Sequence, residues 1–209
     1  MLDFEHEARR KGFGFIIGID EAGRGPLAGP VVSAAVMLKQ TSFKSRIDDS
    51  KKMSEKQREK AFLEIFENSY VGLGIMNESV IDTANILQAT FYSMANAVRQ
   101  LLGSLPQDVV SGESFNRQVL LLIDGPHFKS DLPFSSQPII GGDAKSLSIA
   151  CASIIAKVYR DRILKAYDRI YPEYGFKKHK GYPTHDHRSA IATNGLSPIH
   201  RRSFHVKFI

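Results

Sequence analysis

Four carboxylates stand where short apolar runs end or turn, and these are the residues whose types and spacing could do chemistry. They are Asp20, Glu21, Asp124 and Asp143. Functional side chains of parallel or mixed sheets lie just beyond such strand ends. Four acids gathered there would repel one another, and a hard divalent cation such as Mg²⁺ or Mn²⁺, which prefers oxygen ligands, would remove that repulsion. The pattern therefore predicts a metal site, and two ions roughly 4 Å apart would suit phosphodiester cleavage.

The same acids also fit a purely structural role. Asp124 is followed by Gly125, and Gly142 precedes Asp143. Asp-Gly and Gly-Asp pairs form turns without any ligand. The spacing alone leaves both interpretations open.

Two short segments near these acids could bind phosphate groups. In the first, an arginine lies between two glycines, so that a ligand could approach the backbone amides closely. In the second, a hydroxyl and two ammonium groups come just before a predicted helix, whose N-terminus attracts anions. A tight turn with a surface arginine explains the first equally well, and an N-terminal cap with solvated charges explains the second. The candidates are Gly23, Arg24, Gly25, Ser50, Lys51 and Lys52.

Apolar runs predict the strands that would position these residues. The runs cover residues 13–19, 31–38, 70–76, 118–123 and 138–140. A Gly- and Pro-rich segment separates the first two runs and predicts a turn. The run at 118–123 is continuously apolar, as in a strand buried on both faces.

Three- and four-residue apolar spacing predicts the helices. A capping-box pattern at Ser54 begins one of them, and Pro172 ends the longest. The predicted helices cover residues 54–68, 80–101 as a single helix of about six turns, 146–170 and 185–193. The element order predicts an α/β fold with a mixed sheet and helices packed on it. The segment 103–117 receives no element.

Length and composition indicate one cytoplasmic domain over residues 1–209, since a domain takes about 100–200 residues. We expect its core at about 13–171 and a basic, helical C-terminal segment at about 172–209. The single cysteine, Cys151, excludes an internal disulfide framework and suits a reducing compartment. No apolar run approaches the roughly 20 residues that span a bilayer, and the start lacks the pattern of a signal peptide.

The distribution of charge is more informative than its sum. The chain has 28 Lys and Arg against 22 Asp and Glu, a formal net charge of +6. That sum alone does not separate a phosphate-binding protein from a merely basic one. Residues 177–207, however, hold seven Lys or Arg and a single acid, Asp186. The sequence therefore predicts a basic C-terminal surface.

Five sequence blocks, in order and nearly spanning the chain, resemble the signature blocks of ribonuclease HII, the bacterial type 2 ribonuclease H. They are GIDEAGRGPLAGPVV (18–32), DDSKKMSEKQRE (48–59), LLIDG (121–125), GGDAKSLSIACASIIAKVYRD (141–161) and HKGYPT (179–184), and RRSF (201–204) also fits. The Gly-Arg-Gly form favours this family over the related ribonuclease HIII. Pro126 stands where the family usually has Asn, so no polar contact is expected from that side chain.

The resemblance implies a ribonuclease H-like mixed β-sheet flanked by helices, with a helical C-terminal region. It implies that the four acids form the catalytic set and bind two Mg²⁺ or Mn²⁺ ions. Residues 23–25 would read the ribose 2′-hydroxyl, residues 50–52 would hold backbone phosphates, and Tyr182 would stack on the sugar of the following deoxynucleotide.

The expected activity is hydrolysis of the RNA strand of RNA–DNA hybrids, and cleavage 5′ of a single ribonucleotide in duplex DNA. The products would be a 3′-hydroxyl and a 5′-phosphate, and the enzyme would be a monomer. Two alternatives remain. Another two-metal nuclease of the same fold, such as a junction resolvase, would differ in substrate preference. A non-catalytic nucleic-acid-binding module would show no magnesium dependence.

Overall fold

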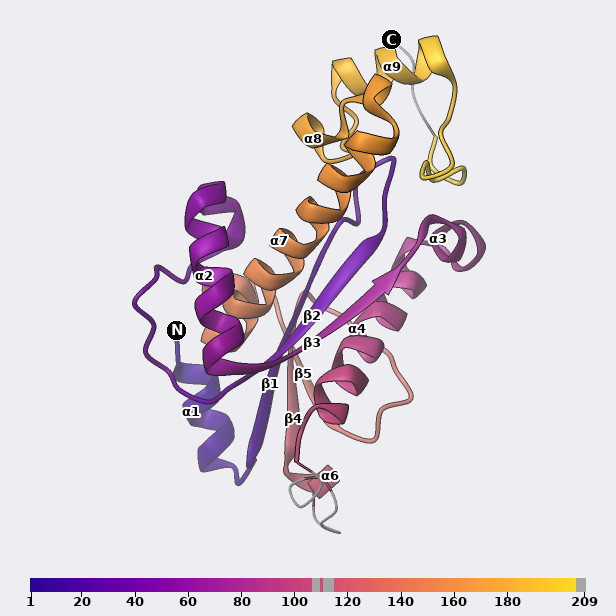
Figure 1. Cartoon of the computed structure of the whole chain (residues 1–209). Coiled ribbons are helices and arrows are strands. Elements are labelled where there is room, and N and C mark those ends of the chain that lie inside the picture. The colour runs from indigo at the N-terminus through magenta and orange to yellow at the C-terminus, as the bar shows by residue number, and fades with distance from the viewer. Residues whose placement is uncertain (107–109, 111–114, 206–209) are drawn as a thin grey trace.

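The computed structural model describes residues 1–106, 110 and 115–205. Within this part of the chain, five strands form one mixed sheet in the order β3-β2-β1-β4-β5 (Figure 1). They are β1 (Phe15–Ala22), β2 (Val31–Leu38), β3 (Ser69–Met76), β4 (Val119–Asp124) and β5 (Ser135–Ile139). Strand β1 runs antiparallel to β2 and parallel to β4. The carboxyl ends of β1 and β4 therefore meet at the same edge of the sheet.

Helices cover both faces of this sheet (Figure 1). The α-helices are α1 (Asp3–Arg10), α2 (Glu55–Asn68), α3 (Glu78–Ala84), α4 (Ile86–Gly103), α6 (Phe115–Gln118), α7 (Leu147–Ile170), α8 (Phe176–His179) and α9 (His185–Asn194). Single 3-10 turns are η1 (Ser50–Lys52), η2 (Gly142–Ala144) and η3 (Pro172–Tyr174). Helices α1, α2 and α7 pack on one face and α4 packs on the other. The predicted mixed sheet flanked by helices is confirmed.

Side-chain alternation along β1 separates the two hydrophobic layers. Ile17 and Ile19 pack toward α4. Ile16 packs against residues of α1 and α7 on the other face. Gly18 shares that second face, where a Cβ would lie 2.2 Å from the carbonyl carbon of Ser148 at the start of α7. The missing side chain therefore lets α7 cross directly over β1.

The single helix expected at 80–101 is wrong, because α3 and α4 are separate helices. The break falls at Asn85, whose φ of 70° lies in the left-handed region. The Asn85 side chain accepts hydrogen bonds from the amides of Leu87 and Gln88 and so caps α4. The apolar spacing continues across the break, which is why periodicity alone does not reveal it.

Two further elements differ from the expectation. Helix α1 is not predicted, although its Glu5 carboxylate accepts a hydrogen bond from the Ser148 amide at 2.9 Å and caps the N-terminus of α7. Strand β5 begins at Ser135 rather than at 138, because its first residues are polar and lie on an edge strand. Of the unassigned segment 103–117, residues 107–109 and 111–114 lie outside the described residues.

The C-terminal helices form a separate apolar cluster beyond the end of the sheet (Figure 1). Leu164 of α7, Phe176 of α8 and Ile191 of α9 are buried in it. The expected helical C-terminal region is therefore present, with its last helix ending at Asn194. Lys207 of the predicted basic surface lies outside the described residues. None of the helices in the described ranges is long and apolar enough to cross a membrane.

Candidate active site

The sheet register brings two of the predicted acids together. Strands β1 and β4 pair in parallel with Ile19 opposite Ile123. The next residues, Asp20 and Asp124, therefore lie side by side where the pairing of β1 with β4 ends. Asp143 reaches the same place from η2, just before α7. One carboxylate oxygen from each of Asp20, Asp124 and Asp143 lies within 4.8 Å of the other two.

Glu21, the fourth predicted acid, lies beside this group rather than in it. Glu21 lines a cavity of about 200 Å³ that Asp20 and Asp124 also line. Its Oε1 is 3.4 Å from Nη1 of Arg24. The cavity is lined by Asp20, Glu21, Ala22, Gly23, Arg24, Gly25, Ser50, Lys51, Asp124, Ser153, Lys157 and Tyr182. The structure thus gathers most of the predicted site residues around one small cavity.

Burial and mutual repulsion disfavour the ionised form of these acids when no cation is bound. Burial raises the pKa of Asp20 well above its ordinary value, and the neighbouring carboxylates of Glu21 and Asp124 raise it further. Burial also raises the pKa of Asp124, with a smaller contribution from Asp143. Lys51 compensates in part, because its Nζ lies 3.3 Å from Oδ2 of Asp143. A buried cluster of oxygen donors with excess negative charge fits a hard divalent ion.

We predict that Asp20→Asn makes the metal-free protein more stable at neutral pH. Because the pKa of Asp20 is raised in the folded state, the folded protein binds the proton of the Asp20 carboxyl group more tightly than the unfolded chain does. The contribution of Asp20 to the free energy of unfolding therefore falls as pH rises from about 3.9, the unfolded value, through the folded pKa.

Thermal unfolding in a chelator at pH 4 and at pH 7.5 checks this prediction. The variant should gain on the wild type as pH rises, with each kcal/mol worth about 2–4 °C in a chain of this size. Added Mn²⁺ should then raise the midpoint of the wild type more than that of the variant. A variant that is less stable than the wild type at pH 7.5 without metal would contradict the electrostatic argument.

The Gly-Arg-Gly turn needs its first glycine for two reasons. Gly23 has a φ of 101°, which L-residues rarely adopt, and a Cβ there would lie 2.1 Å from Nε of the buried Arg160. Gly25 faces the rim of the cavity, where a Cβ would lie 3.9 Å from Cε1 of Tyr182. The Tyr182 side chain is partly exposed and lines the same cavity. Residues 23–25 and Tyr182 therefore line the same cavity, and a ligand bound there would contact both.

The three residues expected to hold phosphates occupy different environments. Ser50 is buried, and its hydroxyl lies 2.9 Å from that of Ser153. Lys51 lines the cavity, as described above. Lys52 is exposed outside the cavity lining, with its Nζ 3.9 Å from Oδ2 of Asp49. Their phosphate contacts remain a prediction, for which Lys51 is the best placed.

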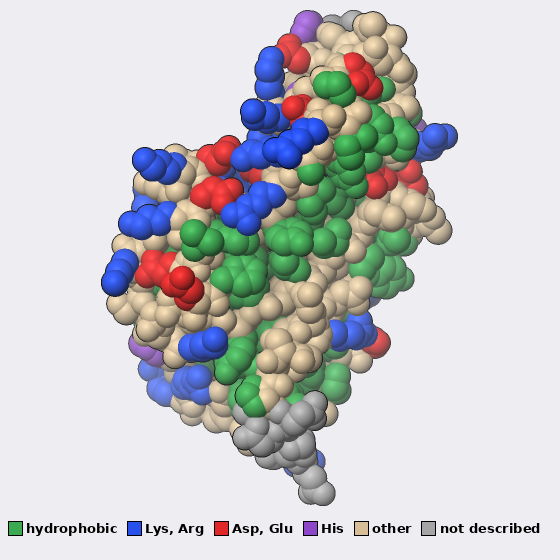
Figure 2. All heavy atoms as spheres, in the orientation of Figure 1, with side chains coloured by type: hydrophobic (Ala, Val, Ile, Leu, Met, Phe, Trp, Pro, Cys, Tyr) green, Lys and Arg blue, Asp and Glu red, His purple; other side chains and the backbone are tan. Residues whose placement is uncertain are grey.

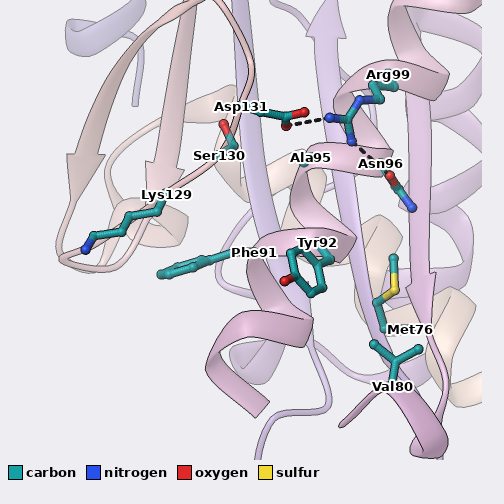
Figure 3. A pocket seen from close by; sticks show the side chains of 10 residues that line it. All are labelled: Met76, Val80, Phe91, Tyr92, Ala95, Asn96, Arg99, Lys129, Ser130 and Asp131. Carbon is teal, nitrogen blue, oxygen red and sulfur yellow. Dashed lines mark hydrogen bonds and ion pairs between the residues drawn. The ribbon is translucent and has the colours of Figure 1, made fainter. Parts of the chain in front are cut away.

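A larger hollow lies elsewhere, between α4 and the loop before β5 (Figure 3). It measures about 560 Å³ and is lined by Met76, Val80, Phe91, Tyr92, Ala95, Asn96, Arg99, Lys129, Ser130 and Asp131. Its acid, Asp131, is paired with Arg99 at 2.5 Å, and Arg99 also donates to Asn96. Size therefore does not identify the active site here, because the smaller cavity holds the acids whose pKa is raised.

The comparisons with known proteins identify the family of this chain. The family model for Ribonuclease HII matches residues 17–207. The chain belongs to the ribonuclease HII family. A ribonuclease HII from Ruminiclostridium cellulolyticum is 48% identical over 210 residues, covering 100% of this chain and 77% of the relative. The family membership expected from the sequence blocks is confirmed.

Two solved structures support the fold. The ribonuclease H2 from Pyrococcus horikoshii has a TM-score of 0.64 at 22% identity, covering 92% of this chain and 94% of that one. The ribonuclease HII in a PCNA complex from Archaeoglobus fulgidus has a TM-score of 0.63 at 21% identity, covering 93% and 97%. As a member of the ribonuclease HII family, the chain is a metal-dependent endoribonuclease with a ribonuclease H-like fold.

Two arginines that no sequence pattern singled out support the backbone around this ribonuclease HII site. Arg160 and Arg201 are each 1% exposed. Arg160 donates to the carbonyls of Ala28, Pro30 and Lys180 at 2.9–3.0 Å. Both arginines lie within the blocks that resemble the family, at KVYRD and RRSF. Their position in those blocks is the sequence feature that could have marked them as part of the site.

A histidine pair fixes the backbone at Tyr182. Nδ1 of His200 accepts a hydrogen bond from the Ser197 amide at 2.9 Å, so its proton lies on Nε2. That Nε2 donates to Nε2 of His187 at 3.0 Å, and Nδ1 of His187 donates to the Tyr182 carbonyl at 2.9 Å. Burial lowers the pKa of His187 and of His200 to about 4. The pair therefore stays neutral at ordinary pH and holds the tyrosine loop in place.

Proposed function

We propose that this ribonuclease HII chain cuts duplex DNA on the 5′ side of an embedded ribonucleotide and hydrolyses the RNA strand of RNA–DNA hybrids. The products are a 3′-hydroxyl and a 5′-phosphate. One observation supports the proposal above all others: Asp20, Asp124 and Asp143 converge within 4.8 Å beside a cavity that the Gly-Arg-Gly turn also lines. The acids suit metal-assisted hydrolysis, and the turn suits recognition of the sugar.

Asp20 would hold both metal ions, because it lies next to Glu21 and Asp124 and is the most deeply buried of the four acids. Asp124, Asp143 and Glu21 would complete the ligand sets, with either Mg²⁺ or Mn²⁺. Bound ions would activate the attacking water and stabilise the leaving 3′-oxygen. Lys51 would release Asp143 and turn to a phosphate, since its ammonium group is at the mouth of the site. No histidine is then required as a general base.

Selectivity for RNA must come from the 2′-hydroxyl, because that group distinguishes a ribonucleotide from a deoxynucleotide. Backbone amides of residues 23–25 can reach it because glycine lets the chain come close. A deoxynucleotide would leave those donors unpaired, which lowers the rate. Tyr182, which lies next to Gly25 at the cavity, would stack on the next sugar.

The basic surface supports a duplex substrate. Lys and Arg side chains gather over α2 and over the α8 end of α7 (Figure 2). Lys157, on α7, lines the cavity itself. All proposed site residues come from one chain, so the proposal requires only a monomer. Its DNA substrate is consistent with the cytoplasmic location expected from the sequence.

The test uses a labelled DNA duplex with one ribonucleotide and an otherwise identical all-DNA duplex, each with and without Mg²⁺. We expect a metal-dependent nick 5′ of the ribonucleotide and no cut in the control duplex. Cleavage of both duplexes would favour another two-metal nuclease of the same fold. Absence of cleavage in both Mg²⁺ and Mn²⁺ would reject the catalytic proposal.

Lys51→Ala should weaken the binding of ribonucleotide-containing and all-DNA duplexes to a similar extent. A single phosphate contact releases about one counterion, so the slope of log K against log salt concentration should fall by about 1. Fluorescence anisotropy at several salt concentrations measures this slope.

Lys39→Ala serves as the matched control, because Lys39 follows β2 at the end remote from the acids and lies over the Tyr70 ring. It should leave the salt dependence unchanged. If Lys51→Ala also leaves it unchanged, Lys51 does not contact phosphate.

A further inference from the structure

The guanidinium of Arg201 contacts the Gly-Arg-Gly turn (residues 23–25) on the side that faces the protein interior. Its Nη1 donates to the Arg24 carbonyl at 2.9 Å, and its Nη2 donates to the Gly23 carbonyl at 2.5 Å. Its Nε and Nη2 also donate to the Gly29 carbonyl, at 2.9 and 2.7 Å. Arg201 is 1% exposed and is not among the residues that line the cavity. It therefore acts on the turn from the protein interior.

These contacts determine which way two backbone amides point. The peptide bonds after Gly23 and Arg24 are trans, and the carbonyl and amide of a trans peptide point to opposite sides. Both carbonyls are directed inward to Arg201, so the amides of Arg24 and Gly25 are directed away from it, toward the cavity. Neither amide donates a hydrogen bond to an acceptor in the described ranges.

We propose that Arg201 is the positioning residue for recognition of the ribose 2′-hydroxyl, because it holds the carbonyls of Gly23 and Arg24 and thereby presents the amides of Arg24 and Gly25 to the sugar. This inference rests on the proposed function and names the residue on which its selectivity depends. Arginine is required, because its planar fork donates to several carbonyls at once, whereas a lysine ammonium acts as a point charge.

The segment that carries Arg201 is itself fixed. The Arg201 amide donates to the Leu27 carbonyl at 2.8 Å. Asp82 of α3 accepts hydrogen bonds from the amides of Arg202 and Ser203, both at 2.9 Å. The Arg201 guanidinium also lies over the ring of Phe204, 5.1 Å from its centroid. These contacts hold the backbone of residues 201–203 in place, so the Arg201 guanidinium reaches the turn from a fixed position.

Binding discrimination tests the proposal in an Asp20→Asn background, which prevents cleavage. The ratio of Kd for an all-DNA duplex to Kd for the same duplex with one ribonucleotide is measured with and without Arg201→Lys. We expect Arg201→Lys to lower this ratio by about tenfold, which corresponds to loss of one hydrogen bond. The Kd for the all-DNA duplex should change little, which a general loss of structure would not allow.

Arg99→Lys is the control for the substitution itself. Arg99 donates to Asn96 and pairs with Asp131 beside α4, and it contacts neither Gly23 nor Arg24. Its lysine variant should keep the discrimination ratio. If Arg201→Lys keeps the ratio, or if both variants lose it equally, the assignment to Arg201 is overturned. If the Asp20→Asn parent itself shows no preference, the proposed reading of the 2′-hydroxyl fails before Arg201 is tested.

A second measurement leaves Arg201 in place and so does not depend on the folding of its variant. In the ¹⁵N-labelled Asp20→Asn protein, the amide signals of Arg24 and Gly25 should shift with the ribonucleotide duplex and much less with the all-DNA duplex. Equal responses to the two duplexes would overturn the proposal even if Arg201→Lys does not fold.

Discussion

Asp20→Asn is expected to abolish cleavage of a duplex with one ribonucleotide while leaving duplex binding largely intact. Asp20 is the most deeply buried member of the acidic group, and an amide in its place could not balance the charge of a divalent ion. Metal stabilisation of the transition state is worth several kcal/mol, so the rate should fall by about a thousandfold or more. Single-turnover cleavage and anisotropy on the same duplex measure the two effects separately.

Asp131→Asn is the control for this prediction, because Asp131 pairs with Arg99 at the hollow beside α4 and not at the acidic group. It should retain both cleavage and binding. Loss of binding together with cleavage in Asp20→Asn would instead indicate a structural role for Asp20. Retention of cleavage would remove it from the metal site.

Gly18→Ala is expected to give a large loss of stability. A Cβ at this position would lie 2.2 Å from the Ser148 carbonyl carbon and 2.4 Å from the Ile149 amide nitrogen. Both atoms belong to the backbone of α7 and cannot rotate away, so the helix must shift from β1. Overpacking of this kind costs about 3 kcal/mol. The shift would also carry Asp143, which precedes α7, away from Asp20, so cleavage should fall with stability.

Urea unfolding of the wild type and of Gly18→Ala measures the loss. Gly103→Ala is the matched control, since a Cβ at the end of α4 would meet nothing within 4 Å. It should be neutral or more stable by up to about 1 kcal/mol, because alanine favours helix. Equal stability of Gly18→Ala and the wild type would mean that α7 does not depend on close contact with β1.

The sequence predicted the parts of the site that follow from local patterns. Asp20 and Asp124 end apolar runs, and the parallel pairing of those runs places them together. The capping box at Ser54 is also present, with Gln57 as its partner. Such features are readable because strand ends and helix starts require particular residue types within a few positions.

The parts that could not be predicted depend on long-range contacts or on a single backbone angle. The break at Asn85 requires a positive φ, which the continuous apolar spacing conceals. Arg201 is buried because of its contacts with residues 23–29, whereas an arginine is ordinarily expected at the surface. Glu5 caps α7 across 143 residues of sequence, so no local pattern relates the two.

The separation between Arg201 and the turn also sets an order of events during protein synthesis. The contact between Arg201 and the Arg24 carbonyl spans 177 residues, and closing so long a loop delays its formation. On the ribosome, all four acids emerge before Arg201 does. A nascent chain can therefore assemble its acidic cluster while residues 23–25 still lack the guanidinium that holds their carbonyls. Under the proposed function, selectivity for RNA would then be the last property that the enzyme acquires.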